Sequence, residues 1–112
     1  MKNNLPLAQD KKLTVLFRLE SGCLGPEGES HIEKFCQVAK SEFATLFSDF
    51  VYWDIIPRRD KSLPEMQYLI NNKKLNQAQA AKFLALFDVK LPDFEHELHK
   101  SLTLCIDRYL GH

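Results

Sequence analysis

Three side chains around the glycine-rich segment after residue 19 have the chemistry of a nucleophilic site. Cys23 lies between an apolar segment and a predicted helix, and His31 follows it by eight residues. A thiol at the start of a helix, with an imidazole as its base, is the arrangement of a cysteine nucleophile, and Glu20 adds an acid–base group. Nearby carboxylates oppose thiolate formation, and no second cysteine stands at Cys-x-x-Cys spacing. We therefore assign no catalytic residue and keep Cys23, His31 and Glu20 as weak candidates of an alternative, a small enzyme.

The glycines of the same segment raise the question of a phosphate site. Gly22, Gly25 and Gly28 recur every third residue between a predicted strand and a predicted helix. This spacing is neither Gly-x-Gly-x-x-Gly nor a loop followed by Gly-Lys-Ser/Thr. Four glutamates and no lysine or arginine occupy residues 20–33, so the local charge opposes an anion. The glycines are interpreted as turn residues.

Two histidines near the C-terminus resemble a zinc-binding pair only superficially. His96 and His99 are three residues apart, whereas the His-Glu-x-x-His motif places its histidines four apart. Both fall on the predicted solvent side of a helix, so a solvated polar face is the simpler interpretation. We predict no functional metal and no cofactor, and keep the two histidines as weak metal candidates.

A basic segment supports a third function class, an RNA- or DNA-associated regulator. Arg58, Arg59 and Lys61 follow an aromatic strand that contains Tyr52. The order of elements resembles that of RNA-recognition modules, whose sheet aromatics stack on bases, but their glycine-containing signature is absent. Nucleic-acid binding is therefore not favoured, and a solvated charged loop is the simpler interpretation.

Composition limits the class of protein. The 112 residues carry 15 basic and 15 acidic side chains, so net charge provides no attraction to nucleic acid or to an anionic membrane. Hydrophobic residues make up 45% of the chain, which is ordinary for one globular domain. No apolar run is long enough to span a bilayer, and no signal peptide is visible. Three widely spaced cysteines give no disulfide framework, which makes the cytoplasm the expected compartment.

Hydrophobic periodicity predicts the elements. Alternation from Leu13 to Glu20 indicates a strand, and a capping box of Ser30 and Glu33 introduces a helix with apolar positions at helical spacing. Residues 63–75 are ambiguous: they form either a capped helix or a third strand, turned at Asn71–Asn72, and we favour the strand. The expected order is a strand at 13–20, a helix from Ser30, strands at 50–56 and 66–70, and helices at 77–87 and 91–110.

This order predicts an α+β fold. We expect a two-layer sandwich in which a small, mostly antiparallel three-stranded sheet carries helices on one face. Residues 1–12 are expected to form a flexible N-terminal arm and residues 13–112 a single domain.

The face without helices is the most informative prediction. If the core side of each strand faces the helices, four apolar side chains share the opposite face, namely Leu16, Tyr52, Ile56 and Leu69. Such a patch approaches the size that marks an interaction site. Three alternatives remain for what covers this patch: the N-terminal arm, the last helix, or another chain. We predict a homo-oligomer or a protein partner, with a ligand left unspecified, and therefore a small cytoplasmic interaction protein.

Overall fold

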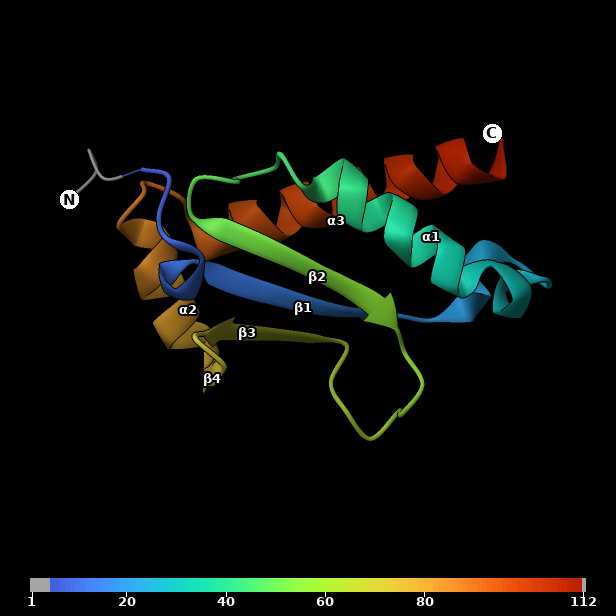
Figure 1. The fold of residues 1–112 in the computed structure, drawn as a ribbon, viewed down its shortest axis with the longest axis horizontal. Helices are drawn as coiled ribbons and strands as arrows, with labels where there is room; N and C mark the ends of the chain where they lie inside the picture. Colours follow the sequence, from blue (N-terminus) through green and yellow to red (C-terminus); the bar gives the residue numbers. More distant parts are fainter. Residues whose placement is uncertain (1–4, 112) are drawn as a thin grey trace.

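The computed structural model describes residues 5–111 as an α+β fold with a four-stranded sheet and three α-helices (Figure 1). The sheet order is β2-β1-β3-β4, so β1 is central and β2 and β4 are the edges. The elements are, in chain order, the 3-10 turn η2 (Gln9–Lys11), β1 (Leu13–Leu19), the 3-10 turn η3 (Ser21–Leu24), α1 (Gly28–Phe43), β2 (Val51–Pro57), β3 (Met66–Ile70), β4 (Lys73–Leu75), α2 (Gln77–Ala85) and α3 (Leu91–Leu110).

The sheet confirms the α+β class and corrects its detail. β1 pairs with β2 in parallel, with Leu13 opposite Val51, and pairs with β3 in the antiparallel sense. The parallel pair follows from the helix between the two strands, because a crossover through α1 returns the chain in the same direction. The predicted three-stranded sheet was wrong in one respect: β4 adds a fourth, antiparallel strand.

The two long helices cover one face of the sheet. Alternate strand residues, among them Val15, Trp53 and Tyr68, are buried against them. Phe94 of α3 is fully buried and stacks on the indole of Trp53, with ring centroids 5.5 Å apart. In Figure 1, part of α3 passes behind β2. The core therefore lies between these helices and one side of the sheet.

The start of α1 differs from the prediction for a physical reason. The helix begins at Gly28 instead of after Ser30, and the Ser30 hydroxyl donates to the Glu27 carbonyl oxygen at 2.8 Å. The predicted Ser30–Glu33 capping box was therefore wrong. A β-carbon at Gly28 would lie 1.8 Å from the carbonyl oxygen of Ser21. Only glycine lets η3 pack this closely on the first turn of α1, which explains one of the three glycines.

The ambiguous segment is extended. Residues 66–70 form β3, and Asn71 and Asn72 turn the chain with φ angles of 50° and 67°. Asparagine tolerates this left-handed region, which allows the two-residue turn into β4. Asn76 then caps α2: its side chain accepts from the Gln79 N–H at 2.8 Å, and the Gln79 side chain accepts from the Asn76 N–H. The interpretation as a helix is excluded.

The segment before β1 runs beside the start of β2. The Leu7 N–H donates to the Asp49 carbonyl oxygen at 2.8 Å, and the Leu7 side chain packs against the core. Residues 1–4 of the predicted arm lie outside the described residues. Within residues 5–111, no helix is both long and apolar enough to cross a bilayer.

Candidate functional site

One face of the sheet carries no helix, and the strand register defines what it presents. In a strand, alternate side chains point to opposite faces, so residues in register across the sheet share a face. Thr14 lies between Tyr52 and Leu69, and Leu16 lies between Asp54 and Gln67. We call this surface the helix-free face; its apolar members Leu16, Tyr52, Ile56 and Leu69 are all half-buried within the single chain.

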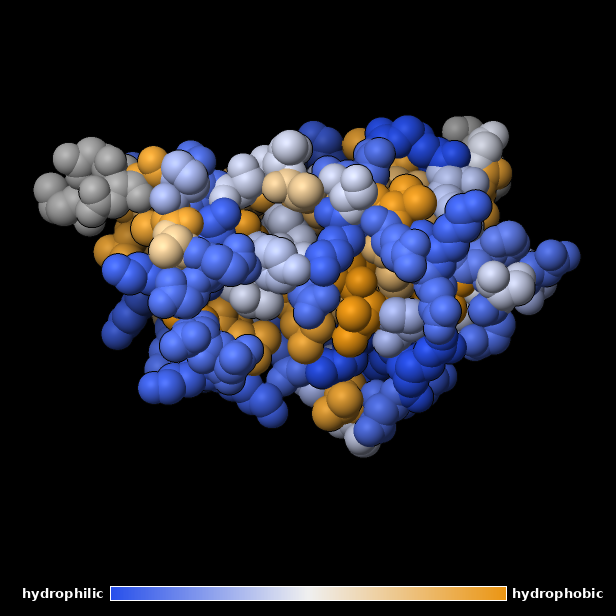
Figure 2. Space-filling view, in the orientation of Figure 1, coloured by the Kyte–Doolittle hydropathy of each residue, from blue (hydrophilic) through white to orange (hydrophobic). Residues whose placement is uncertain are grey.

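The hydrophobic side chains of this surface alternate with polar ones. Figure 2 shows orange residues over the middle of the sheet, bordered by blue ones. Leu16 occupies the central strand, and its register neighbours on both sides are polar. The structure thus brings the four predicted interface residues onto one face with Leu16 at its centre.

Arg18 forms the polar end of the helix-free face. It is only 8% exposed, and its guanidinium donates to Gln67 Oε1 at 2.6 Å and to the Pro64 carbonyl oxygen at 2.8 Å. Within residues 5–111 no carboxylate oxygen lies within 4 Å of it. A buried cation needs hydrogen-bond acceptors, and here two neutral oxygens accept from its Nη1. Arg18 thereby ties β1 to β3 and to the segment before β3.

An ion pair borders the helix-free face along β2. Lys40 of α1 lies 3.8 Å from an Asp54 carboxylate oxygen, and its ammonium is 5.2 Å from the centre of the Tyr52 ring. The hydrogen bond with Tyr52 raises the pKa of Lys40. The lysine side chain therefore reaches from the helical layer across the outer edge of β2.

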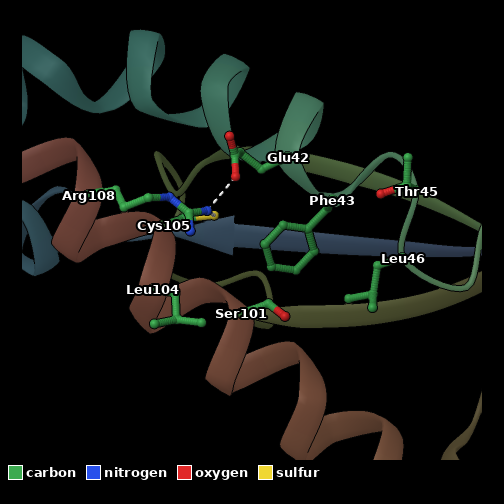
Figure 3. Close-up of a pocket in the computed structure, with 8 residues that line it drawn as sticks. All are labelled: Glu42, Phe43, Thr45, Leu46, Ser101, Leu104, Cys105 and Arg108. Atoms are coloured by element: carbon green, nitrogen blue, oxygen red, sulfur yellow. Dashed lines mark hydrogen bonds and ion pairs between the residues drawn. The ribbon is translucent and has the colours of Figure 1, made fainter.

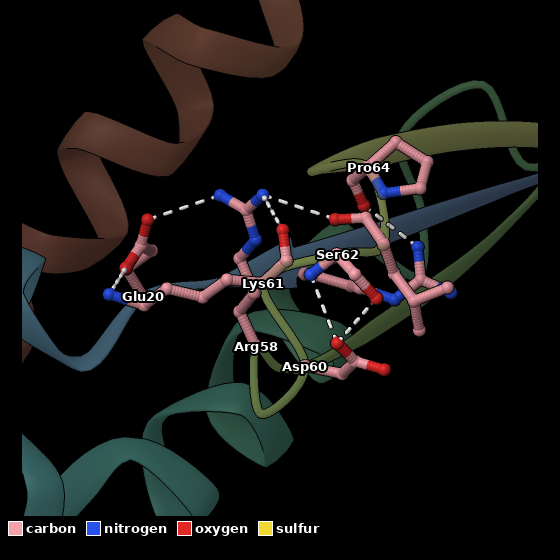
Figure 4. A network of polar contacts seen from close by, with 8 residues as sticks. Glu20, Arg58, Asp60, Lys61, Ser62 and Pro64 are labelled. Atoms are coloured by element: carbon pink, nitrogen blue, oxygen red, sulfur yellow. Dashed lines mark hydrogen bonds and ion pairs between the residues drawn. The ribbon is translucent and has the colours of Figure 1, made fainter.

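The predicted basic segment is neutralised by its surroundings. Arg58 lies 3.1 Å from a Glu20 carboxylate oxygen and also donates to the carbonyl oxygens of Lys61 and Leu63 (Figure 4). The Lys61 ammonium lies 3.4 Å from the other Glu20 oxygen.

Arg59 lies 3.2 Å from a carboxylate oxygen of Glu29 and 2.7 Å from one of Glu33. With Arg58 and Lys61 held by Glu20, each of the three cations is already beside a carboxylate. Because these glutamates flank η3 and the first turns of α1, the network ties the loop before β3 to that end of the molecule. A phosphate backbone would have to displace these carboxylates.

Each of the three catalytic candidates is engaged by other groups. The Cys23 thiol has a raised pKa, chiefly through burial and further through Glu20 and Glu65. His31 faces α3, where its Nδ1 lies 3.4 Å from the Tyr109 hydroxyl. The Glu20 carboxylate is held by Arg58 and Lys61. A neutral thiol is a weak nucleophile, and within residues 5–111 no hydrogen bond joins Cys23 to His31, so these contacts do not support the enzyme alternative.

The histidine pair lies on the exposed side of α3. His96 and His99 are both exposed, and the His99 ring contacts Phe17 at 6.3 Å between centroids. Within residues 5–111, no three side chains of His, Cys, Asp or Glu converge as a metal site would require.

A hollow lies between the end of α1 and α3, away from the sheet face. It measures about 240 Å³, and the ion pair between Glu42 and Arg108 crosses one side of it (Figure 3). Phe43 lies at its centre in the figure, and Leu104 at its border is 48% exposed. Ligand sites usually enclose about 300–1,000 Å³ and bury most of the ligand, so this shallow hollow does not indicate a small-molecule site.

Comparison with known proteins adds no functional information. No family model matches the chain, and the search found no similar curated protein and no similar solved structure.

Two features of these surfaces were missed from the sequence. One is the burial of Arg18, and the other is the position of Lys40 across the edge of β2. Arg18 occupies an outward position of an alternating strand, which predicts exposure; only the covering loop makes it buried. Lys40 lies on the boundary of a helical apolar face, so its contact depends on the angle between helix and sheet.

Proposed function

We propose that this protein is a small interaction protein and that two copies associate through the helix-free face. The observation that carries the proposal is the set of four half-buried apolar side chains, with Leu16 on the central strand, over which no helix or strand of residues 5–111 is packed. Burying one leucine side chain contributes about 2 kcal/mol before the costs of association. The zero net charge supplies no long-range repulsion between copies.

The size of the face predicts a weak dimer. The three strands β2, β1 and β3 form a face about 15 Å wide, from the spacing between strands, and about 20 Å long, from the rise per residue. Its area is therefore ~300 Å² per copy. A stable interface typically buries about 800 Å² on each partner. We therefore expect association at high micromolar concentration, unless side chains at the border add to the contact.

Charge selects the orientation of the two copies. With the twofold axis along β1, Leu16 meets its own copy, Tyr52 lies over Leu69, and Asp54 lies over Gln67. With the axis across the strands, Asp54 would meet Asp54 of the second copy, and like charges in contact are unfavourable. Arg18 is too deeply buried to present its charge in either arrangement. The arrangement with the twofold axis along β1 is therefore the favoured one.

Sedimentation equilibrium between about 5 µM and 1 mM tests the proposal, a range that brackets weak micromolar association. Leu16→Arg places a charge at the centre of the face and should leave the protein monomeric throughout. Leu86→Arg is the matched control, because Leu86 is 66% exposed just after α2, away from the sheet. A monomeric wild-type protein at the highest concentration, or a dimer unchanged by Leu16→Arg in a folded variant, refutes the proposal.

We also infer a cytoplasmic location. The three cysteines are all unpaired, which is typical of a reducing compartment. Cell fractionation with an antibody against the protein tests this, and recovery from an oxidising compartment would contradict it.

A further inference from the structure

The first residues of β3 run past the end of the short β4 and have no strand on that side (Figure 1). The Arg18 N–H donates to the Glu65 carbonyl oxygen at 2.7 Å. Along an antiparallel ladder, hydrogen-bonded pairs alternate with non-bonded ones. Odd-numbered residues of β3 therefore bond to β1, and even-numbered ones turn their backbone groups towards β4.

Met66 is the even-numbered residue that β4 does not reach. The β3–β4 ladder ends where Tyr68 lies opposite Leu75. The register would next place Met66 opposite Gln77, but Gln77 begins α2 and has left the sheet. Within residues 5–111 the Met66 N–H has no acceptor outside the β1–β3 ladder, and its place in that ladder is a non-bonded one. This N–H is therefore a donor that a ligand can use.

A cavity lies beside this unpaired backbone, and we call it the β3–β4 cavity. It measures about 320 Å³, at the lower end of the ~300–1,000 Å³ that is usual for ligand sites. Tyr68, which is 5% exposed, provides an apolar wall together with Met66 and Leu75. The cavity therefore suits a small ligand with an apolar part. The lining residues are Pro64, Met66, Gln67, Tyr68, Lys74, Leu75, Asn76 and Gln77.

The charge around the cavity is positive. Among these lining residues only Lys74 is charged, and no carboxylate oxygen of residues 5–111 lies within 4 Å of its ammonium. The Gln67 side chain accepts from Arg18 through its oxygen, which leaves its N–H groups as donors. The whole segment of residues 66–87 contains three lysines and no acidic residue. An anionic group on the ligand is therefore favoured at this site.

We propose that the β3–β4 cavity binds a small organic monocarboxylate, whose carboxylate group is held by the Lys74 ammonium and the Met66 N–H. One ammonium balances one negative charge, whereas inorganic phosphate carries more charge and has no apolar part. The hydrocarbon part of the ligand lies against Tyr68 and Leu75, where its burial adds to the affinity. This inference does not rest on dimerisation through the helix-free face, although Gln67 borders both surfaces.

NMR titration of the isotope-labelled full chain with benzoate, and separately with hexanoate, tests the proposal. A protein concentration of about 50 µM stays below the high micromolar range expected for the dimer. Without ligand, the Met66 amide should exchange with solvent faster than those of Gln67 and Tyr68, which are bonded within the sheet. Each probe should shift the backbone amides of Met66 and Gln77 along one binding curve. A Kd of about 1 mM is expected for a ligand of this size.

Two comparisons separate the effect of charge from that of shape. Benzamide has the same ring but no charge, so it should bind about fivefold more weakly than benzoate. Lys74→Gln should weaken benzoate binding by a similar factor and remove the preference for benzoate over benzamide. Lys73→Gln is the matched control, because it makes the same charge change on a neighbour that does not line the cavity. It should change the Kd for benzoate by less than about twofold.

Four results overturn the proposal. The first is a Met66 amide that exchanges as slowly as its neighbours in the free protein, which would show that its N–H is already bonded. The second is the lack of any shift at the lining residues with either probe at about 10 mM, ten times the expected Kd. The third is equal binding of benzamide and benzoate, or an equal loss in the two lysine variants. The fourth is inorganic phosphate bound as tightly as benzoate, which would identify a phosphate site instead.

Discussion

The close approach of η3 to α1 gives the sharpest test of the structure. Gly28→Ala places a β-carbon 1.8 Å from the Ser21 carbonyl oxygen and 3.3 Å from the Leu24 β-carbon. An ordinary carbon–oxygen contact is well above 3 Å, so η3 or the first turn of α1 must move by more than 1 Å. Overpacking of this kind costs about 1–3 kcal/mol. The better helix propensity of alanine offsets less than about 1 kcal/mol, because the position is the first of the helix.

The matched control lies six residues earlier. A β-carbon at Gly22 would meet no atom within 4 Å, so Gly22→Ala should change the free energy of unfolding by no more than about 0.5 kcal/mol. Urea denaturation followed by circular dichroism measures both variants. A loss of about 1–3 kcal/mol in Gly28→Ala should also lower Tm by about 4–24 °C, given ~4–8 °C per kcal/mol in small domains. If the two variants are equally stable, η3 does not pack on α1 as described.

Further predictions concern the core, a cap and the thiols. Phe94→Ala should lower the free energy of unfolding by about 3–5 kcal/mol in urea titration, because the fully buried ring stacks on an indole; a loss below 1 kcal/mol would contradict that packing. Asn76→Ala should cost about 1 kcal/mol through loss of the α2 cap, seen as a lower Tm, whereas an unchanged Tm would show that the cap is not needed. Burial raises the pKa of Cys36 to about 11, so iodoacetamide at pH 8 should modify it about 100-fold more slowly than a thiol of pKa 9. Mass spectrometry should find Cys36 and Cys105 modified only on unfolding, and rapid native labelling of either would contradict their burial.

The sequence predicted the elements better than it predicted how they pair. Alternation identified β1 and the helix-free face, and the buried positions of α1 from Ile32 to Phe43 follow the expected helical spacing. These patterns are local, because one buried face imposes its period on the chain. The short β4, Lys73–Leu75, has no apolar alternation and was missed. A two-residue turn and the pairing with β3 hold β4 in place. Neither produces a hydrophobic periodicity in its sequence.

The start of α1 was missed because tertiary packing overrode a local motif. Ser30 and Glu33 match a capping box, yet Gly28 lets the chain enter the helix three residues earlier against η3. The ion pairs of the charged candidate residues also depend on partners far away in the sequence. Nothing near Arg58 in the sequence indicates that Glu20, 38 residues away, would neutralise it.

The central position of β1 also governs how the chain can assemble. As the first strand made, β1 emerges with both sides unpaired, and its neighbours begin 38 and 53 residues later, at Val51 and Met66. Both ladders therefore close long stretches of chain, which slows folding. Until these ladders form, the apolar side chains of residues 13–19 stay exposed to water. During synthesis only the adjoining helix α1, or a chaperone, can cover them.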